Sequence, residues 1–142
     1  DGRIGVGGTQ RLKLLLDTHV IVWSVADPER LPADMLNKLK EPSNELWYSP
    51  ISAWEILLLA EKGRLSLKGD PKNGVKKLFR MLPFKEAVLN YEVAVQSRYL
   101  DLLHADPADR FIAATAVVYG LILVTADKRL AVSKDFSVLA IG

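Results

Sequence analysis

The sequence predicts an α/β domain in which helices flank a central parallel sheet, giving three α/β/α layers. Short apolar runs alternate with longer segments of helical periodicity, the order expected for strands joined by crossover helices. The first apolar run, residues 12–16, has almost no polar alternation, as in a strand buried on both faces of a parallel sheet. A chain of 142 residues can form one such domain. We expect it to occupy residues 11–142.

The elements of the first half follow from apolar periodicity and from the residues that begin and end helices. Pro50 suits the first turn of a helix and Gly63 suits the position just past its end, which predicts a helix over residues 51–62. The expected order is a strand at 12–16, helices at 18–25 and 31–40, a strand at 46–49, and helices at 51–62 and 72–81.

The second half continues the same alternation. Its clearest helix covers residues 109–119, where apolar residues recur at helical spacing until Gly120. The expected order is a strand at 84–88, helices at 91–102 and 109–119, a strand at 121–125, a short helix at 128–134 and a last strand at 138–141.

The composition is that of an ordinary globular protein, with 49% hydrophobic and 25% charged residues. The absence of cysteine excludes disulfides and zinc–thiolate sites, so a cytoplasmic location is expected. The apolar runs are shorter than the ~18 residues that a bilayer requires, and no membrane association is expected. Residues 1–10 contain four glycines and no apolar signal segment, and we expect a flexible tail or an expression remnant there.

Four acidic residues stand where the surrounding sequence is apolar. Asp17 and Asp127 each follow a predicted strand, at the sheet edge where open α/β sheets bind ligands. Glu55 is the only charged residue between Glu45 and Glu61, and a lone buried carboxylate costs several kcal/mol. Asp109 opens an apolar helix.

Each acid also has a purely structural interpretation. Asp17, Asp109 and Asp127 precede predicted helices and could serve only as N-caps. Glu55 could be paired with an Arg or a Lys. Asp106, three residues before Asp109, competes with it for any role at that helix terminus.

The acids together favour a metal site. Parallel strands bring Asp17 and Asp127 to one edge of the sheet, and clustered carboxylates repel each other unless a cation neutralises them. A set of oxygen ligands, without cysteine, suits Mg²⁺ or Mn²⁺ rather than zinc. Such ions serve phosphate chemistry.

Four short motifs, in order over about residues 14–141, resemble those of the PIN-domain nucleases. They are LLLDTHVIVW, SPISAWEILLL, HADPADRFIAATA and LVTADKRL. The similarity is greatest to the toxin ribonucleases of bacterial and archaeal type II toxin–antitoxin pairs. This resemblance implies a PIN-like fold and a Mg²⁺- or Mn²⁺-dependent endoribonuclease that leaves a 5′-phosphate and a 3′-hydroxyl. It also implies a homodimer and a cognate antitoxin.

The resemblance assigns roles to individual residues. The acidic quartet of the family falls on Asp17, Glu55, Asp109 and Asp127, with Asp106 as an additional acid that could bind the metal. Thr18 and Thr125 match hydroxyl positions that orient ligands or water. Between the two candidates for the third acid, Asp109 is favoured over Asp106.

A basic segment lies between residues 62 and 85. It carries eight basic residues against one acid, a charge of +7, so the rest of the chain carries −5. We expect this segment to attract an RNA backbone, although it could also be an ordinary solvated helix face. Its basic residues are Lys62, Arg64, Lys68, Lys72, Lys76, Lys77, Arg80 and Lys85.

Two other functional classes remain open. A Mg²⁺-dependent phosphatase or phosphotransferase could use Asp17 as a nucleophile, but its sequence DTHV lacks the second acid of the haloacid-dehalogenase type. A non-catalytic RNA- or protein-binding module could use the same basic segment. Among the aromatic residues, Trp54 and Trp23 are expected in the core rather than in base stacking, while Trp47 is ambiguous. His19 and His104 are expected to face solvent or to pack rather than to contact substrate.

Overall fold

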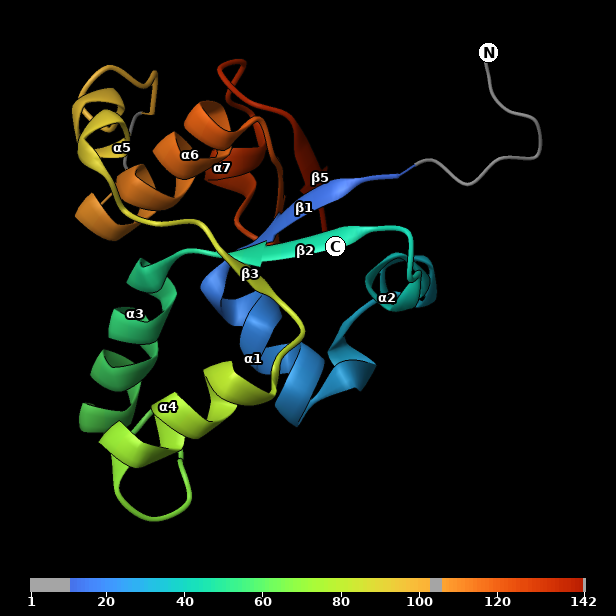
Figure 1. Cartoon of the computed structure of the whole chain (residues 1–142), viewed down its shortest axis with the longest axis vertical. Helices are drawn as coiled ribbons and strands as arrows, with labels where there is room; N and C mark the ends of the chain where they lie inside the picture. The colour runs from blue at the N-terminus through green and yellow to red at the C-terminus, as the bar shows by residue number, and fades with distance from the viewer. Residues whose placement is uncertain (1–10, 103–105, 142) are drawn as a thin grey trace.

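The computed structural model describes residues 11–102 and 106–141, so the predicted tail at 1–10 and His104 lie outside the described residues. A single sheet organises this part of the chain. Its strands are β1 (Lys13–Leu16), β2 (Glu45–Tyr48), β3 (Lys85–Glu86), β4 (Ile122–Thr125) and β5 (Val138–Ala140). They lie in the order β3-β2-β1-β4-β5, and every neighbouring pair is parallel. Figure 1 shows β1 and β2 side by side. The predicted fold class is confirmed.

The helices connect these strands in the expected order, with a 3-10 turn, η1 (Pro28–Arg30), that the sequence analysis did not predict. They are α1 (Thr18–Ala26), α2 (Ala33–Lys40), α3 (Pro50–Glu61), α4 (Pro71–Met81), α5 (Tyr91–Gln96), α6 (Pro107–Tyr119) and α7 (Lys128–Ala131).

Helix α5 is shorter than predicted, ending at Gln96 instead of continuing to residue 102. The guanidinium of Arg110 on α6 donates to the backbone oxygens of Ser97, at 2.9 Å, and Leu102, at 3.1 Å. These side-chain hydrogen bonds satisfy carbonyls of the segment after α5. The predicted helix was too long because these carbonyls accept from Arg110, a side chain on the next helix, which the local sequence pattern does not indicate.

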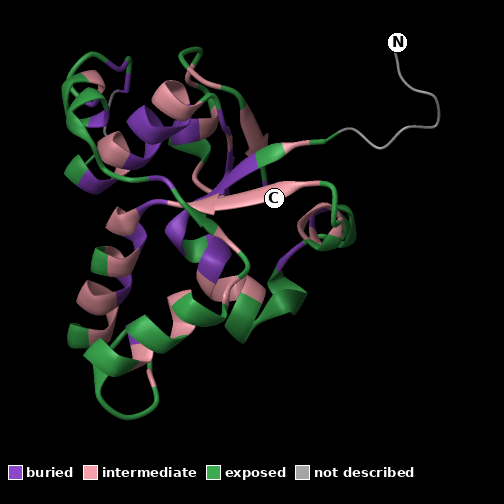
Figure 2. Cartoon of the chain, viewed as in Figure 1, coloured by how far each residue is buried: buried purple, intermediate pink, exposed green. Residues whose placement is uncertain are grey.

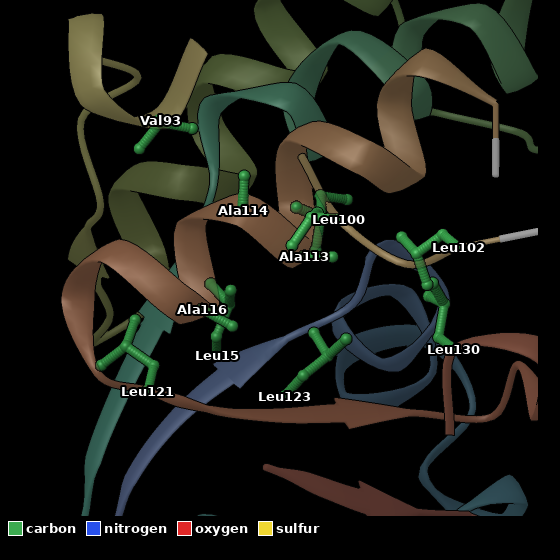
Figure 3. Close-up of a cluster of buried hydrophobic side chains, with 11 residues drawn as sticks. Leu15, Val93, Leu100, Leu102, Ala113, Ala114, Ala116, Leu121, Leu123 and Leu130 are labelled. Atoms are coloured by element: carbon green, nitrogen blue, oxygen red, sulfur yellow. The ribbon is translucent and has the colours of Figure 1, made fainter. Parts of the chain in front are cut away.

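Alternate residues of β1 pack into two cores on opposite faces of the sheet. Leu15, together with Leu123 of β4, lies beneath the alanines of α6, as Figure 3 shows. Leu14 and Leu16 contribute to the second core, which includes residues of α1 and α2. All three β1 leucines are fully buried, which explains the continuous apolar run.

Helix α6 lies close to the sheet because its inner face is built from small residues. Ala113 and Ala114 are fully buried, and Ala116 is nearly so. The helix ends at Gly120, whose φ of 65° belongs to the left-handed region that favours glycine. This packing brings α6 against Leu15 of β1 and Leu123 of β4.

Helices α3 and α4 pack against each other and extend away from the sheet (Figure 1). Although the sequence of α3 is almost entirely apolar, Figure 2 shows much of the helix as intermediate or exposed. Trp54, which was expected in the core, is 55% exposed, whereas Ile56 is fully buried. The expectation was wrong because α3 is covered on only part of its surface.

The strand order places a topological switch point between β1 and β4. From β1 the chain builds the sheet through β2 to β3 on one side, and β4 and β5 lie on the other. At such a point the connections leave in opposite directions and open a crevice at the carboxyl ends of the two strands. Within the described parts of the chain, no helix is long and apolar enough to cross a membrane.

Candidate active site

Asp17 and Asp127 lie at the switch point, as their positions after β1 and β4 predict. Leu16 is in register with Val124, and the amide of Asp17 donates to the Val124 carbonyl at 3.0 Å. Both acids are also N-caps, because Asp17 accepts from the amide of Thr18 and Asp127 accepts from that of Arg129. Asp17 and Asp127 therefore cap helices and also lie at the edge of the sheet where ligands bind.

Asp17 is held in a buried position. Its residue exposure is 9%, and its two carboxylate oxygens accept from the Thr18 amide at 2.8 Å and the Thr125 hydroxyl at 2.7 Å. Burial raises the pKa of Asp17, and the two hydrogen bonds oppose that rise. The side chain is fixed before any ligand binds.

Thr125 links the two acids at the strand ends. Its side chain is fully buried at the end of β4. Its hydroxyl donates to Asp17 and accepts from the Asp127 amide at 3.0 Å. The orienting role expected for Thr125 agrees with these contacts.

Glu55 is held by hydroxyl groups. Thr18 donates its hydroxyl proton to Glu55 Oε1 and lies 2.9 Å from the Ser52 hydroxyl on α3. Because Thr18 has one hydroxyl proton, its oxygen accepts from Ser52. Among the described residues, no Lys or Arg forms an ion pair with Glu55, so the structural alternative of a basic partner finds no support there. Burial, with repulsion from Asp17 and Asp106, raises the pKa of Glu55.

Ser52 was missed by the sequence analysis. It is fully buried and lies three residues before Glu55, on the same side of α3. A small polar residue at that spacing in an otherwise apolar helix was the available signal.

Asp109 and Asp106 have different roles at the start of α6. The helix begins at Pro107, two residues earlier than predicted, and Asp106 is its N-cap, accepting from the Asp109 amide at 2.9 Å. Asp109 is therefore not a cap, and its side chain is only 16% exposed. Burial, followed by repulsion from Asp106, Asp17, Glu55 and Asp127, raises the pKa of Asp109 to about 7. These repulsions indicate that Asp109 faces the other acids.

Asp127 is paired with a residue that the sequence analysis did not select. Arg129 donates from Nε at 3.1 Å and from a terminal nitrogen at 2.9 Å to the two carboxylate oxygens. These bonds lower the pKa of Asp127. The same terminal nitrogen lies 4.0 Å from Asp109. Arg129 is thus a cation belonging to the chain itself at the edge of the acidic cluster.

The donor atoms suit a hard divalent cation, because the cluster offers carboxylate and hydroxyl oxygens and unrelieved negative charge. In this conformation, no group of three or more His, Asp or Glu side chains within residues 11–102 and 106–141 is spaced to hold a metal ion. Arg129 engages Asp127, and Thr18 engages Glu55. Metal binding would therefore require the side chains of Asp127 and Glu55 to rotate away from Arg129 and Thr18.

A pocket of about 410 Å³ opens beside the acids, between α3 and α6. Glu55 and Asp106 contribute to its wall, and the rest is mostly apolar. Its lining residues are Ile51, Trp54, Glu55, Leu58, Asp106, Pro107, Ala108 and Phe111.

The basic segment is fully on the surface. Lys72, Lys76 and Arg80 follow one another at helical spacing along α4, and Lys62 lies just past the end of α3. The opposite side of α4 contributes Val75 and packs toward α3. All eight basic residues from 62 to 85 are exposed. His19, expected to face solvent or to pack, is exposed on α1 near Trp23.

The substitution Asp109→Asn is expected to stabilise the metal-free protein at pH 8. Because the folded pKa of about 7 exceeds the ordinary 3.8, the stability of the wild type falls as the pH rises through that interval. The variant lacks this loss, so its Tm at pH 8 should be higher by about 2–5 °C, and the difference should shrink below pH 5. The exposed Asp101→Asn serves as the control, and a lower Tm for Asp109→Asn at pH 8 would contradict the interpretation.

The substitution Arg129→Gln is expected to strengthen Mn²⁺ binding about two- to fivefold, because the exposed ion pair between Arg129 and Asp127 is weak and competes with the metal for the Asp127 carboxylate. Isothermal titration calorimetry on the purified protein measures the change. Lys128→Gln removes the same charge from the same helix, and no ion pair is formed by Lys128 with the described acids. Weaker Mn²⁺ binding by Arg129→Gln would mean that Arg129 holds Asp127 in a ligating orientation.

Comparisons with known proteins agree with the site and the fold. A family model described as PIN domain matches residues 14–134. Ribonuclease VapC22 of Mycobacterium tuberculosis (strain ATCC 25618 / H37Rv) is 36% identical over 120 residues, which cover 82% of this chain and 88% of that protein.

Solved structures share the architecture. VapBC2 from Rickettsia felis, bound to a promoter DNA fragment, superposes with a TM-score of 0.69 and 16% identity, covering 92% of this chain and 100% of that one. FitAcB from Neisseria gonorrhoeae superposes with a TM-score of 0.60 and 24% identity, covering 89% and 96%. The motif resemblance noted in the sequence is thereby confirmed, and the chain belongs to the PIN domain family.

Proposed function

We propose that this protein is a divalent-metal-dependent endoribonuclease and the toxin of a toxin–antitoxin pair. The observation that carries the proposal is that Asp17 and Asp127 follow the two strands of the switch point, and that these two acids and Glu55 lie close enough to Asp109 to raise its pKa. The 36% identity to a protein named as a ribonuclease supports the reaction class. Membership of the PIN domain family supports the use of a divalent metal.

The four acids would hold Mg²⁺ or Mn²⁺, with Asp106 as a further oxygen donor near the rim. A divalent cation bound there lowers the pKa of a bound water and stabilises negative charge on a phosphate. The remaining work falls to the chain itself. Thr125 fixes Asp17, so this carboxylate is oriented before substrate arrives, whereas Glu55 has to turn away from Thr18 to bind a metal.

The structure argues against the phosphotransferase alternative. A nucleophilic aspartate needs an oxygen that can approach the phosphorus atom. Both oxygens of Asp17 accept hydrogen bonds, and the residue is 9% exposed. Hydrolysis by a water held among the acids fits this arrangement better than a covalent intermediate does, and the family resemblance implies a 5′-phosphate and a 3′-hydroxyl as the product ends.

The exposed basic segment supports a nucleic-acid substrate. Lys72, Lys76 and Arg80 form a row on α4, which packs against the helix that carries Glu55. A row of cations beside an acidic pocket attracts the backbone of the strand, and a bound metal offsets the charge of the pocket. A non-catalytic binding module could use the same row of cations, so it is the cluster of acids that favours cleavage over binding alone.

A protein partner is proposed from the relatives. The structural neighbours include a toxin–antitoxin complex from Klebsiella pneumoniae and the DNA-bound VapBC of Salmonella typhimurium. By analogy, this chain would form a homodimer and be restrained by a cognate antitoxin.

Wild-type protein is expected to cleave total RNA with Mg²⁺ or Mn²⁺ and not with EDTA, and Asp17→Asn should lower cleavage by at least about 100-fold. The reason is the loss of one negatively charged ligand from the most rigid acid of the site. Gel analysis and mapping of the cleavage ends measure the result. The control is Asp34→Asn, an exposed acid on α2. Equal cleavage by the wild type and Asp17→Asn would overturn the proposed site.

Combined replacement of Lys72, Lys76 and Lys77 by Ala should weaken RNA binding and flatten its salt dependence. Each lost phosphate contact removes about 0.7 from the slope of log K against log salt for a single strand, so the slope should fall in magnitude by about 2. Fluorescence anisotropy with a short RNA measures the slope. A matched triple variant at the exposed Lys13, Lys40 and Lys134 should leave it nearly unchanged, and equal effects would remove the special role of α4.

A further inference from the structure

We propose that the pocket between α3 and α6 binds one unpaired nucleobase of the RNA strand, next to the phosphodiester that is cleaved, with Trp54 as its stacking platform. This inference rests on the proposed ribonuclease function and adds to it a subsite on the substrate side. Three features carry it: two aromatic side chains beside two acids, the exposure of Trp54, and the position of the basic segment.

The pocket brings aromatic residues to the acidic cluster from two helices. Trp54 precedes Glu55 on α3, and Phe111 lies two residues after Asp109 on α6. Both aromatic residues line the same pocket of about 410 Å³, and Glu55 lies in its wall. A strand whose phosphate is held by the acids therefore places a neighbouring nucleotide within reach of Trp54 and Phe111.

The exposure of Trp54 is unusual for its position. Trp54 is 55% exposed in the middle of an apolar helix, while Ile56 is fully buried. Trp47, in contrast, is partly buried against α6, and its ring nitrogen donates to Glu45. A large aromatic surface left open to solvent beside a reactive site marks a contact surface for a ligand.

The apolar and aromatic lining of the pocket suits the flat ring of a nucleobase. Every base has a π-face, and single-stranded RNA is commonly held by stacking its unstacked bases on aromatic side chains. The row of cations on α4 continues from the outer end of α3, where Lys62 lies, and supplies contacts for the phosphates of the same strand. Acids, aromatic pocket and basic row thus follow one another along α3, in an order that suits a single extended strand.

The test couples a protein change to an RNA change. A short single-stranded RNA containing a mapped cleavage site is prepared intact and with an abasic residue at each of the three nucleotides on either side of that site. The kcat/KM of wild type, Trp54→Ala and Trp54→Phe is measured on each RNA. Trp54→Ala should lower kcat/KM on intact RNA by about 5- to 100-fold, and Trp54→Phe should retain most of the activity.

The decisive result is that, at one flanking position, the effects of Trp54→Ala and of the abasic residue on kcat/KM do not add. There the abasic RNA should lower wild-type activity to the level of Trp54→Ala, and should leave Trp54→Ala itself unchanged. Tyr99→Ala, which removes an aromatic ring that is 78% exposed and outside the pocket, should not alter the pattern. Thermal melting verifies that each variant is folded.

Two outcomes would overturn the proposal while leaving the ribonuclease function intact. One is an active wild type with equal losses from Trp54→Ala on intact and abasic RNA at every position. The other is normal cleavage of intact RNA by Trp54→Ala; a simultaneous shift from dimer to monomer in size-exclusion chromatography would make the pocket an interface between two copies of this chain. A wild type without metal-dependent cleavage would instead overturn the ribonuclease function, and the subsite with it.

Discussion

The burial of Asp17 at the switch point of the sheet is the constraint on which the rest of the site depends. A carboxylate that is 9% exposed would be strongly destabilising without hydrogen-bond donors. The donors come from the first amide of α1 and from the hydroxyl of Thr125 at the end of β4. The register between β1 and β4 therefore fixes the acid, and the same register brings Asp127 beside it. A shift of either strand would separate the acid from its donors.

The four acids differ in how far neighbouring groups offset their negative charges, and the charge that is not offset favours binding of a cation. Arg129 neutralises Asp127, and hydrogen bonds hold Asp17 and Glu55. Asp109 has the least compensation, and burial with the repulsion of its neighbours raises its pKa to about 7. A site with excess negative charge and oriented oxygens has a strong affinity for a small hard cation. The chain's own Arg129 supplies part of that positive charge and so competes with the metal.

Local sequence patterns predicted the parts of the structure that depend on neighbouring residues. The apolar run of β1 and the stop of α6 at Gly120 are of this kind, and the acids after β1 and β4 follow from the parallel topology. The errors concern contacts between distant segments. The Arg110 guanidinium donates to backbone oxygens of the segment after α5, where a longer helix was predicted. Partial coverage of α3 leaves Trp54 exposed. Ser52 and Arg129 were overlooked because their partners are identified only when the elements pack together.

The central claim is that Asp17, Glu55, Asp109 and Asp127 hold one divalent-metal site. Mn²⁺-induced broadening of backbone amide NMR signals tests it most directly, because broadening falls steeply with distance from the ion and needs no catalysis. Substoichiometric Mn²⁺ is expected to broaden the amides around these four residues first, with those of Thr18 and Thr125, and to leave the amides of β3 sharp. Broadening centred on another group of acids, such as Glu45 and Glu86, would contradict it, as would uniform broadening over the whole chain.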